Sequence, residues 1–269
     1  MAINDWTRGT CGTGDSKIHY VRTGRMLPPI VLLHGLGGNG ACWTPLARSL
    51  ENEFDVVMPD ARGHGLSDSS IEGFRYEGLA GDVLGLIEGL ELVAPVLLGH
   101  SMGGMTAAVV AGNVGEAISA VILADPTFLS PQRQREVYES GAKDQHSRLL
   151  GMDKEEALAE ARTHHPRRTS EIVELLVEAR MRTRIAAFDV LAPPGPDYHE
   201  LVRKIAVPAF LIVGDSGSVV SIEEASELQR LNPNIRIAQI QDAGHGLQYD
   251  QPERFAELVR AFLRSIVVS

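Results

Sequence analysis

The sequence predicts an α/β fold in which helices flank a mostly parallel sheet and a helical cap is inserted into the sheet domain. Short apolar runs that end in Gly or Asp alternate with amphipathic stretches, the pattern of a parallel sheet covered by helices. This alternation stops after Asp125-Pro126 and resumes at Val207-Pro208. We therefore expect a core formed by residues 1–126 and 205–269, with a helical cap over residues 127–204.

Seven apolar runs are the expected strands, and the amphipathic stretches between them are the expected helices. The strands cover residues 18–21, 30–33, 56–58, 96–98, 120–123, 210–213 and 235–240. The helices include residues 76–90, 102–112, 222–231 and 252–266. The cap has charged, helix-prone stretches and no strand-like run. Because insertions over the carboxyl edge of a sheet usually shape a pocket, we expect the cap to line one.

The composition predicts a soluble globular protein. The 269 residues are 44% hydrophobic, enough for one large domain with an insertion. The formal net charge of −10 is spread along the chain, which argues against nucleic acid and anionic membranes as partners. No apolar run approaches the roughly 18 residues that span a bilayer, and no signal-peptide pattern opens the chain. We expect a cytoplasmic monomer or homodimer.

The two cysteines, Cys11 and Cys42, predict neither a metal site nor a disulfide framework. Two reduced thiols fit a cytoplasmic protein. We expect neither a metal nor a cofactor.

The most informative motif is Gly99-His100-Ser101-Met102-Gly103, which matches G-x-S-x-G. It stands directly after an expected strand and directly before an expected helix, the context in which this motif holds a serine on a strained turn. The two glycines remove side chains that would collide where strand and helix meet. The pattern predicts that Ser101 is a nucleophile.

A serine hydroxyl is a weak nucleophile at neutral pH and needs an adjacent base. His245 is the best candidate, because it follows the last expected strand on a glycine-flanked loop that can reach back over the sheet edge. His64 is interpreted as part of a structural turn, and His146 as a solvated residue.

A second glycine-rich stretch, His34-Gly35-Leu36-Gly37-Gly38, follows the expected strand at residues 30–33. Its backbone can fold close to the serine, so that the N–H groups of Leu36 and Met102 converge on a developing oxyanion. Such donors stabilise the charge of a tetrahedral intermediate. We expect these two N–H groups to form an oxyanion hole.

With these motifs in place, the chain resembles the α/β-hydrolase superfamily across nearly its whole length. The matching segments, in the order of the superfamily, are His34-Gly35-Leu36-Gly37, Pro59-Asp60-Ala61-Arg62-Gly63-His64-Gly65-Leu66-Ser67-Asp68, Gly99-His100-Ser101-Met102-Gly103-Gly104 and Ala243-Gly244-His245. The resemblance implies an eight-stranded type of sheet. It is to the capped branch of small esterases, lactonases, carbon–carbon bond hydrolases and cofactor-free haloperoxidase-like enzymes. A serine at the nucleophile position argues against dehalogenases and epoxide hydrolases, which use an aspartate.

The chain departs from this resemblance at the acid of the triad. In most relatives the acid lies after the penultimate strand, three residues after a glycine, and here that position is Gly217. Asp215 is one substitute. Asp125, at the end of the strand that follows the serine turn, is the other and is favoured, because some members of the superfamily place their acid there.

Trp43, Phe128 and Leu247 are the expected substrate-binding residues. Arginines 180, 182 and 184 are assigned to solvent, since their spacing spreads them over different faces of a helix. The expected substrate is accordingly small and largely apolar.

The expected activity is hydrolysis of a carboxylic ester or lactone through an acyl-enzyme formed by Ser101, His245 and Asp125. A carbon–carbon bond hydrolase or a cofactor-free haloperoxidase or perhydrolase would use the same parts, and fold alone does not choose among them. A small-molecule receptor of the same fold is a further alternative.

Overall fold

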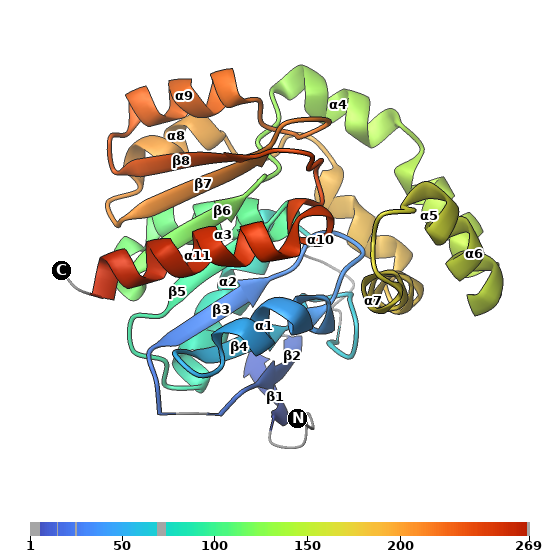
Figure 1. The fold of residues 1–269 in the computed structure, drawn as a ribbon, viewed down its shortest axis with the longest axis horizontal. Helices are drawn as coiled ribbons and strands as arrows, with labels where there is room; N and C mark the ends of the chain where they lie inside the picture. The colour runs from blue at the N-terminus through green and yellow to red at the C-terminus, as the bar shows by residue number, and fades with distance from the viewer. Residues whose placement is uncertain (1–5, 15, 25, 69–73, 268–269) are drawn as a thin grey trace.

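The computed structural model describes residues 6–14, 16–24, 26–68 and 74–267, and it confirms the predicted α/β fold (Figure 1). The described residues form an eight-stranded sheet in the order β1-β2-β4-β3-β5-β6-β7-β8. β1 and β2 pair antiparallel, as do β2 and β4, and every other neighbouring pair is parallel. The strands are β1 (Thr7–Thr13), β2 (Ser16–Arg22), β3 (Pro29–Leu33), β4 (Asp55–Pro59), β5 (Val96–His100), β6 (Ala120–Ala124), β7 (Ala209–Gly214) and β8 (Ile235–Ile240).

The sequence prediction missed β1. Its residues are mainly Thr, Gly and Arg, so no apolar run marks it, and it lies at the edge of the sheet. Only Cys11 and Thr13 are buried, on the face that meets α2. An edge strand with one short buried face carries too little apolar signal to be recognised by periodicity.

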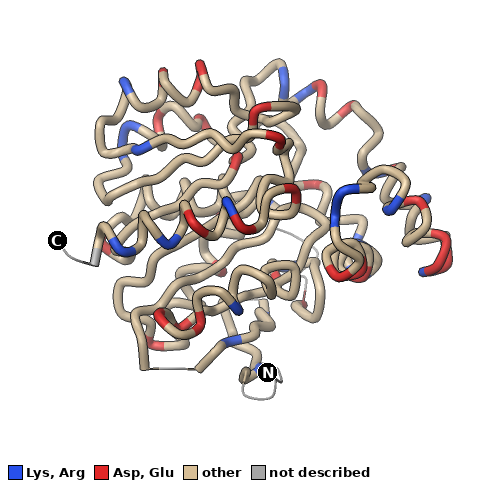
Figure 2. The backbone as a smooth tube through the Cα atoms, viewed as in Figure 1, with Lys and Arg blue, Asp and Glu red and all other residues tan. Residues whose placement is uncertain are grey.

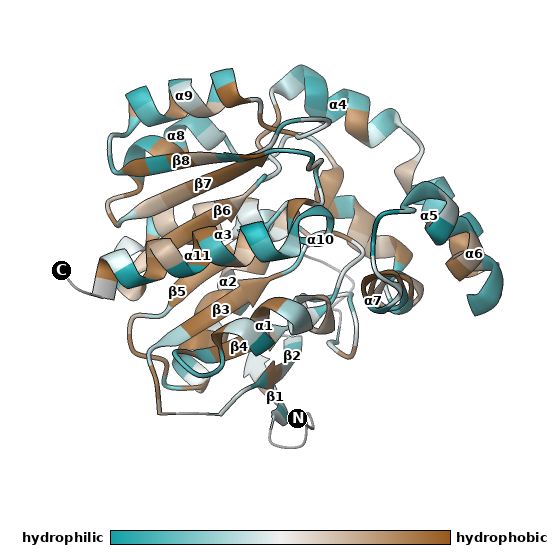
Figure 3. Ribbon diagram, viewed as in Figure 1, coloured by the Kyte–Doolittle hydropathy of each residue, from teal (hydrophilic) through white to brown (hydrophobic). Residues whose placement is uncertain are grey.

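Helices cover both faces of the sheet, because neighbouring residues of each central strand point to opposite sides. Val31 and Leu33 of β3 join one core cluster, whereas Ile30 and Leu32 join the other. Figure 3 shows the central strands as the most apolar part of the chain. The first cluster packs on α2 (Tyr76–Gly89), α3 (Met102–Asn113) and α9 (Ile222–Leu231), and the second on α1 (Thr44–Leu50), α10 (Leu247–Asp250) and α11 (Pro252–Val267). Two short 3₁₀ helices are η1 (Gly40–Trp43) and η2 (Gly115–Ala117).

Between β6 and β7 the chain is helical, and this insertion extends from the end of the sheet where the parallel strands terminate (Figure 1). Its helices begin at recognisable caps: the Asp153 side chain accepts from the Glu156 N–H, and Thr169 accepts from the Ile172 N–H. Charged residues are frequent along α5, α6 and α7 (Figure 2). The elements are α4 (Pro131–Glu139), α5 (Ala142–Leu150), α6 (Lys154–His164), α7 (Ser170–Met181), η3 (Ile185–Leu191) and α8 (Tyr198–Lys204).

The last helix of this insertion belongs to the packing of the sheet domain. Leu201 and Val202 of α8 are buried in the same cluster as α3, and Gly112 of α3 approaches the Leu201 backbone closely. The segment that rises beyond the sheet is therefore formed by α4 to α7 and η3. Over the described residues, none of the helices is both long enough and apolar enough to cross a bilayer.

A buried ion pair ties the loop after β4 to α2. Arg62 and Asp82 form two hydrogen bonds of 2.6 and 2.8 Å, and the Thr13 hydroxyl donates to the same carboxylate at 2.6 Å. Both charged side chains are only 6% exposed. This triple contact holds β1, α2 and the turn beside the oxyanion loop together.

We expect Asp82→Asn to lower the free energy of unfolding by about 3–5 kcal/mol, because it removes the negative charge that Asp82 sets against the buried Arg62 guanidinium. Urea unfolding measures the change. Glu171→Gln removes the exposed partner of Arg48 and serves as the control, with little expected change. Equal effects of the two variants would contradict the structural role of the buried pair.

Candidate active site

The strand-to-helix turn at Ser101 requires both glycines of the motif. Ser101 lies between β5 and α3 with φ 54° and ψ −116°, a strained conformation that pushes its side chain out of the turn. A Cβ on Gly99 would lie 2.1 Å from the Gly103 carbonyl oxygen, and a Cβ on Gly103 would lie 2.3 Å from the Leu33 carbonyl oxygen. Since both obstacles are backbone atoms, neither position accepts a side chain.

The structure brings Ser101, His245 and Asp125 into one hydrogen-bonded line. His245 Nε2 lies 2.9 Å from Ser101 Oγ, and His245 Nδ1 lies 2.6 Å from Asp125 Oδ2. With Nδ1–H donating to the carboxylate, Nε2 is left to accept the serine proton. The Ser101 hydroxyl also lies 3.4 Å from the hydroxyl of Thr127, a neighbour that sequence reasoning did not single out.

Asp125 rather than Asp215 faces His245. Asp125 ends β6 with φ 40°, is fully buried, and accepts further hydrogen bonds from the N–H groups of Val219 and Val220 at 2.9 and 3.0 Å. These donors come from the loop in which most relatives would carry the acid. Gly217 in that loop is left-handed, and a Cβ added to it would meet nothing within 4 Å.

Asp215 holds the turn that leads to His245. Its carboxylate accepts from the N–H groups of Asp242 and Ala243 at 3.0 and 3.2 Å. These backbone hydrogen bonds, first that of Asp242, lower the pKa of Asp215. Its contacts indicate a structural role for the second candidate acid.

His100 fixes the loop that carries His245. Its Nε2–H donates to the His245 carbonyl oxygen at 2.7 Å, and the two rings lie 4.8 Å apart. Burial lowers the pKa of His100 well below 6.5, so the ring is neutral at pH 7. His100 therefore positions His245 without placing a second positive charge beside it.

The loop of residues 34–38 lies against the serine turn, and two neutral histidines hold it. His34 donates to the Gly35 carbonyl and accepts from the Ala61 N–H at 2.9 Å, and His64 accepts from the Gly37 N–H at 3.2 Å. Burial lowers the pKa of His34 to about 4 and that of His64 to about 3. At pH 7 each ring therefore has one unprotonated nitrogen. This nitrogen accepts the hydrogen bond from the backbone N–H of Ala61 or Gly37.

The two expected oxyanion donors are available for a ligand. A Cβ on Gly35 would lie 3.2 Å from Ser101 Cβ, so the loop runs directly beside Ser101. Among the described residues, the N–H groups of Leu36 and Met102 have no acceptor, and Met102 opens α3, where N–H groups lack partners within the helix.

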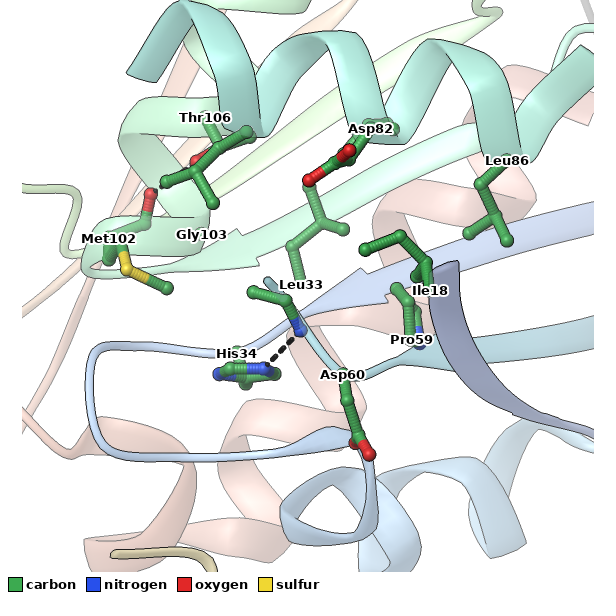
Figure 4. Close-up of a pocket in the computed structure, with 13 residues that line it drawn as sticks. Ile18, Leu33, His34, Pro59, Asp60, Asp82, Leu86, Met102, Gly103 and Thr106 are labelled. Atoms are coloured by element: carbon green, nitrogen blue, oxygen red, sulfur yellow. Dashed lines mark hydrogen bonds between the residues drawn. The ribbon is translucent and has the colours of Figure 1, made fainter. Parts of the chain in front are cut away.

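Figure 4 shows the side chain of Met102 turned toward a small interior cavity that His34 also lines.

A cavity of about 710 Å³ opens between the glycine-rich loop and the helical insertion. The loop residues 35–38 and His100 form its base, and α5, α6 and α7 form its opposite wall. Its lining combines apolar side chains such as Leu149 and Val177 with three arginines. The insertion thus supplies most of the surface that a substrate would meet.

Trp43, Phe128 and Leu247, the expected substrate-binding residues, do not line this cavity. Trp43 is 1% exposed and stacks on Phe255, and Leu247 is fully buried in the same cluster. Phe128 is 2% exposed and stacks on Tyr198. All three belong to the cores that flank the sheet, because large apolar side chains are more stable when they are removed from water.

Comparison with known proteins agrees with this architecture. A family model described as alpha/beta hydrolase fold matches residues 28–252. N-formylmaleamate deformylase of Pseudomonas putida is 26% identical over 260 residues, which cover 95% of this chain and 96% of that protein. The sn-1-specific diacylglycerol lipase of Mus musculus is 27% identical over 251 residues, covering 88% and 81% of the two chains. The crystal structure of E-2-(acetamidomethylene)succinate hydrolase has a TM-score of 0.85 at 22% identity, covering 96% of this chain and 99% of that one, a likeness in fold.

We expect Asp125→Asn to lower the turnover of p-nitrophenyl acetate by about 10⁴, because His245 then loses the partner that sets its tautomer. Asp215→Asn, the matched control, should lower turnover far less, through a looser turn. Initial rates at pH 7.5 and thermal unfolding of both variants measure this. Loss of turnover in Asp215→Asn alone would assign the acid to Asp215.

The pKa of His64 predicts an acid-sensitive fold. Above pH 6.5 the imidazole is neutral in both folded and unfolded chains, whereas below it the unfolded chain takes up a proton that the folded chain resists. Stability therefore falls as the pH drops from about 6.5 toward 3. Between pH 7.5 and pH 5.0 we expect His64 to account for a loss of about 2 kcal/mol.

Urea unfolding of the parent protein and of His64→Gln at these two pH values tests this expectation. The glutamine oxygen can still accept from the Gly37 N–H but does not titrate. His199→Gln, at an exposed position, is the control. An unchanged pH dependence in His64→Gln would refute the assignment.

Proposed function

The chain belongs to the α/β-hydrolase family, and we propose that it hydrolyses a small carboxylic ester or lactone through an acyl-enzyme on Ser101. The observation that carries the proposal is the line from Ser101 through His245 to Asp125, with distances of 2.9 and 2.6 Å. Short hydrogen bonds from nucleophile to base and from base to acid are the geometry that activates a serine.

In the first half of the reaction, Ser101 Oγ bonds to the substrate carbonyl carbon while its proton passes to His245 Nε2. The carbonyl oxygen becomes an anion, which the N–H groups of Leu36 and Met102 stabilise. The imidazolium formed on His245 is paired with the buried Asp125 carboxylate. When the intermediate collapses, the bond to the alkoxy oxygen breaks and Nε2 returns the proton to that oxygen.

In the second half, a water molecule takes the place of the alcohol. His245 Nε2 accepts a proton from the water as its oxygen bonds to the acyl carbon. The second intermediate collapses by breaking the bond to Ser101 Oγ, and Nε2 returns the proton to the serine. The enzyme is regenerated and a carboxylic acid is released, so the proton and electron balance closes without a cofactor.

A lipase among the relatives supports ester chemistry, and a deformylase among them supports a related attack on a carbon–nitrogen bond. The ester or lactone is preferred because an alkoxide oxygen is a better leaving group than an amide nitrogen, so the intermediate collapses with less help from the proton on His245. The expected alternatives, cleavage of a carbon–carbon bond and perhydrolysis, would pass through the same serine.

We expect Ser101→Ala to lower the hydrolysis of p-nitrophenyl acetate by on the order of 10⁴ to 10⁶ while the melting temperature stays near that of the parent. A fluorophosphonate probe should label the parent at Ser101 and leave the variant unlabelled, as read by peptide mass spectrometry. Ser140→Ala, at an exposed serine after α4, is the control. A label on another residue would remove the basis of the proposal.

A further inference from the structure

Arg180 occupies an unusual position for an arginine on the insertion. It was expected in solvent together with Arg182, but α7 turns it into the cavity, whereas Arg182 is exposed. Its side chain lies on the glycine-rich loop, since a Cβ on Gly37 would meet Arg180 Cδ at 2.7 Å and Nη1 at 3.4 Å. The guanidinium is therefore two residues along the loop from Gly35, which contacts the serine.

The three arginines of the cavity differ in their partners. Arg148 pairs with Glu160, and Arg168 pairs with Asp250 at 2.9 Å. Arg180 has no carboxylate partner among the residues that the structure describes. Partial burial of a cation without a counterion is costly, and a ligand of opposite charge would offset that cost.

A built environment holds the Arg180 guanidinium in one orientation. His146, which is fully buried and not solvated as expected, donates from Nε2–H to the Thr183 carbonyl at 2.9 Å. Its Nδ1 is therefore an acceptor and receives the Arg180 Nε–H at 3.2 Å. The ring of Phe188 stacks on His146 at 4.6 Å and lies 5.3 Å from the guanidinium carbon.

These contacts use the Nε–H and one face of the guanidinium. Among the described residues, the N–H groups on its two terminal nitrogens have no acceptor. Two such nitrogens form the planar fork that binds both oxygens of a carboxylate. Gly35 and Gly37 are two residues apart, and consecutive Cα atoms lie 3.8 Å apart. A substrate group bound by Arg180 near Gly37 is therefore only a few covalent bonds from a carbonyl placed at Ser101.

We propose that Arg180 binds a carboxylate of the substrate, so that the molecule cleaved at Ser101 carries a free carboxylate a few bonds from its scissile carbonyl. This inference rests on the proposed function for the reaction, but the binding of the anion can be measured without it. His146 acts as a positioning residue for Arg180. The largely apolar substrate expected from the sequence is thereby replaced by an anionic one.

The kinetic test compares monomethyl succinate with methyl pentanoate, a neutral ester of similar length. The parent should prefer the anionic ester in kcat/KM, and Arg180→Gln should reduce that preference by about tenfold or more through KM, since hydrogen bonds to charged groups are lost. Arg180→Lys keeps the positive charge but lacks the two terminal nitrogens of the guanidinium, and it should retain part of the preference for the anionic ester. Arg182→Gln should behave like the parent.

His146→Phe tests the positioning role. It preserves a ring against Phe188 and removes the acceptor for Arg180 Nε–H. We expect a raised KM for monomethyl succinate and an unchanged KM for methyl pentanoate. Equal changes for the two esters would show that His146 only maintains the structure.

The binding test uses Ser101→Ala, which cannot turn over. Succinate should raise its melting temperature, and the added Arg180→Gln change should abolish the shift. Succinate stabilisation that survives Arg180→Gln, or its absence in the presence of Arg180, would overturn the inference. Failure of the proposed function looks different: neither ester is cleaved, the probe does not label Ser101, and the succinate shift still depends on Arg180.

Discussion

A single buried carboxylate connects the parts of the site that come from distant stretches of the chain. Asp125 is completely enclosed and accepts hydrogen bonds from His245 and from two successive backbone N–H groups, those of Val219 and Val220. A carboxylate removed from water is tolerated only when its oxygens are satisfied in this way. The loops after β7 and β8 must therefore close around the end of β6, and that closure brings the imidazole to Ser101.

Neutral imidazoles form the second element of this arrangement. His34, His64 and His100 are each buried, and burial lowers the pKa of each. Each donates one hydrogen bond to a backbone carbonyl, and two of them accept one from a backbone N–H. A charged ring 4.8 Å from His245 would oppose the imidazolium that forms there during turnover. Burial of these rings thus keeps positive charge away from the place where the reaction creates it.

Local patterns predicted the parts of the molecule that depend on backbone geometry. The serine turn, with glycines on either side, is specified within five residues, and the parallel sheet by apolar runs of regular spacing. The choice of Asp125 over Asp215 followed from a resemblance combined with Gly217. The structure gives the physical reason, because Asp215 is occupied by the N–H groups of Asp242 and Ala243.

Features that depend on tertiary packing were not visible in the sequence. Trp43, Phe128 and Leu247 are apolar residues near the motifs, and only their neighbours in space decide that they enter the core and not the cavity. The pairing of His146 with Arg180 joins α5 to α7 across 34 residues of sequence. No periodicity distinguishes an arginine that points into a cavity from one that points into water.

The position of the acid on β6 also has an evolutionary consequence. The turn around Gly217 contributes no side chain to the hydrogen-bonded line, only the N–H groups of Val219 and Val220, which any residue except proline could supply. Gly217 is left-handed with open space around it, and aspartate is among the residues that adopt this conformation most readily. A second carboxylate can therefore arise in this turn by mutation while Asp125 is still in place. A chain that carried both would have a carboxylate at each of the two positions where the superfamily places its acid, so that losing one would still leave the other.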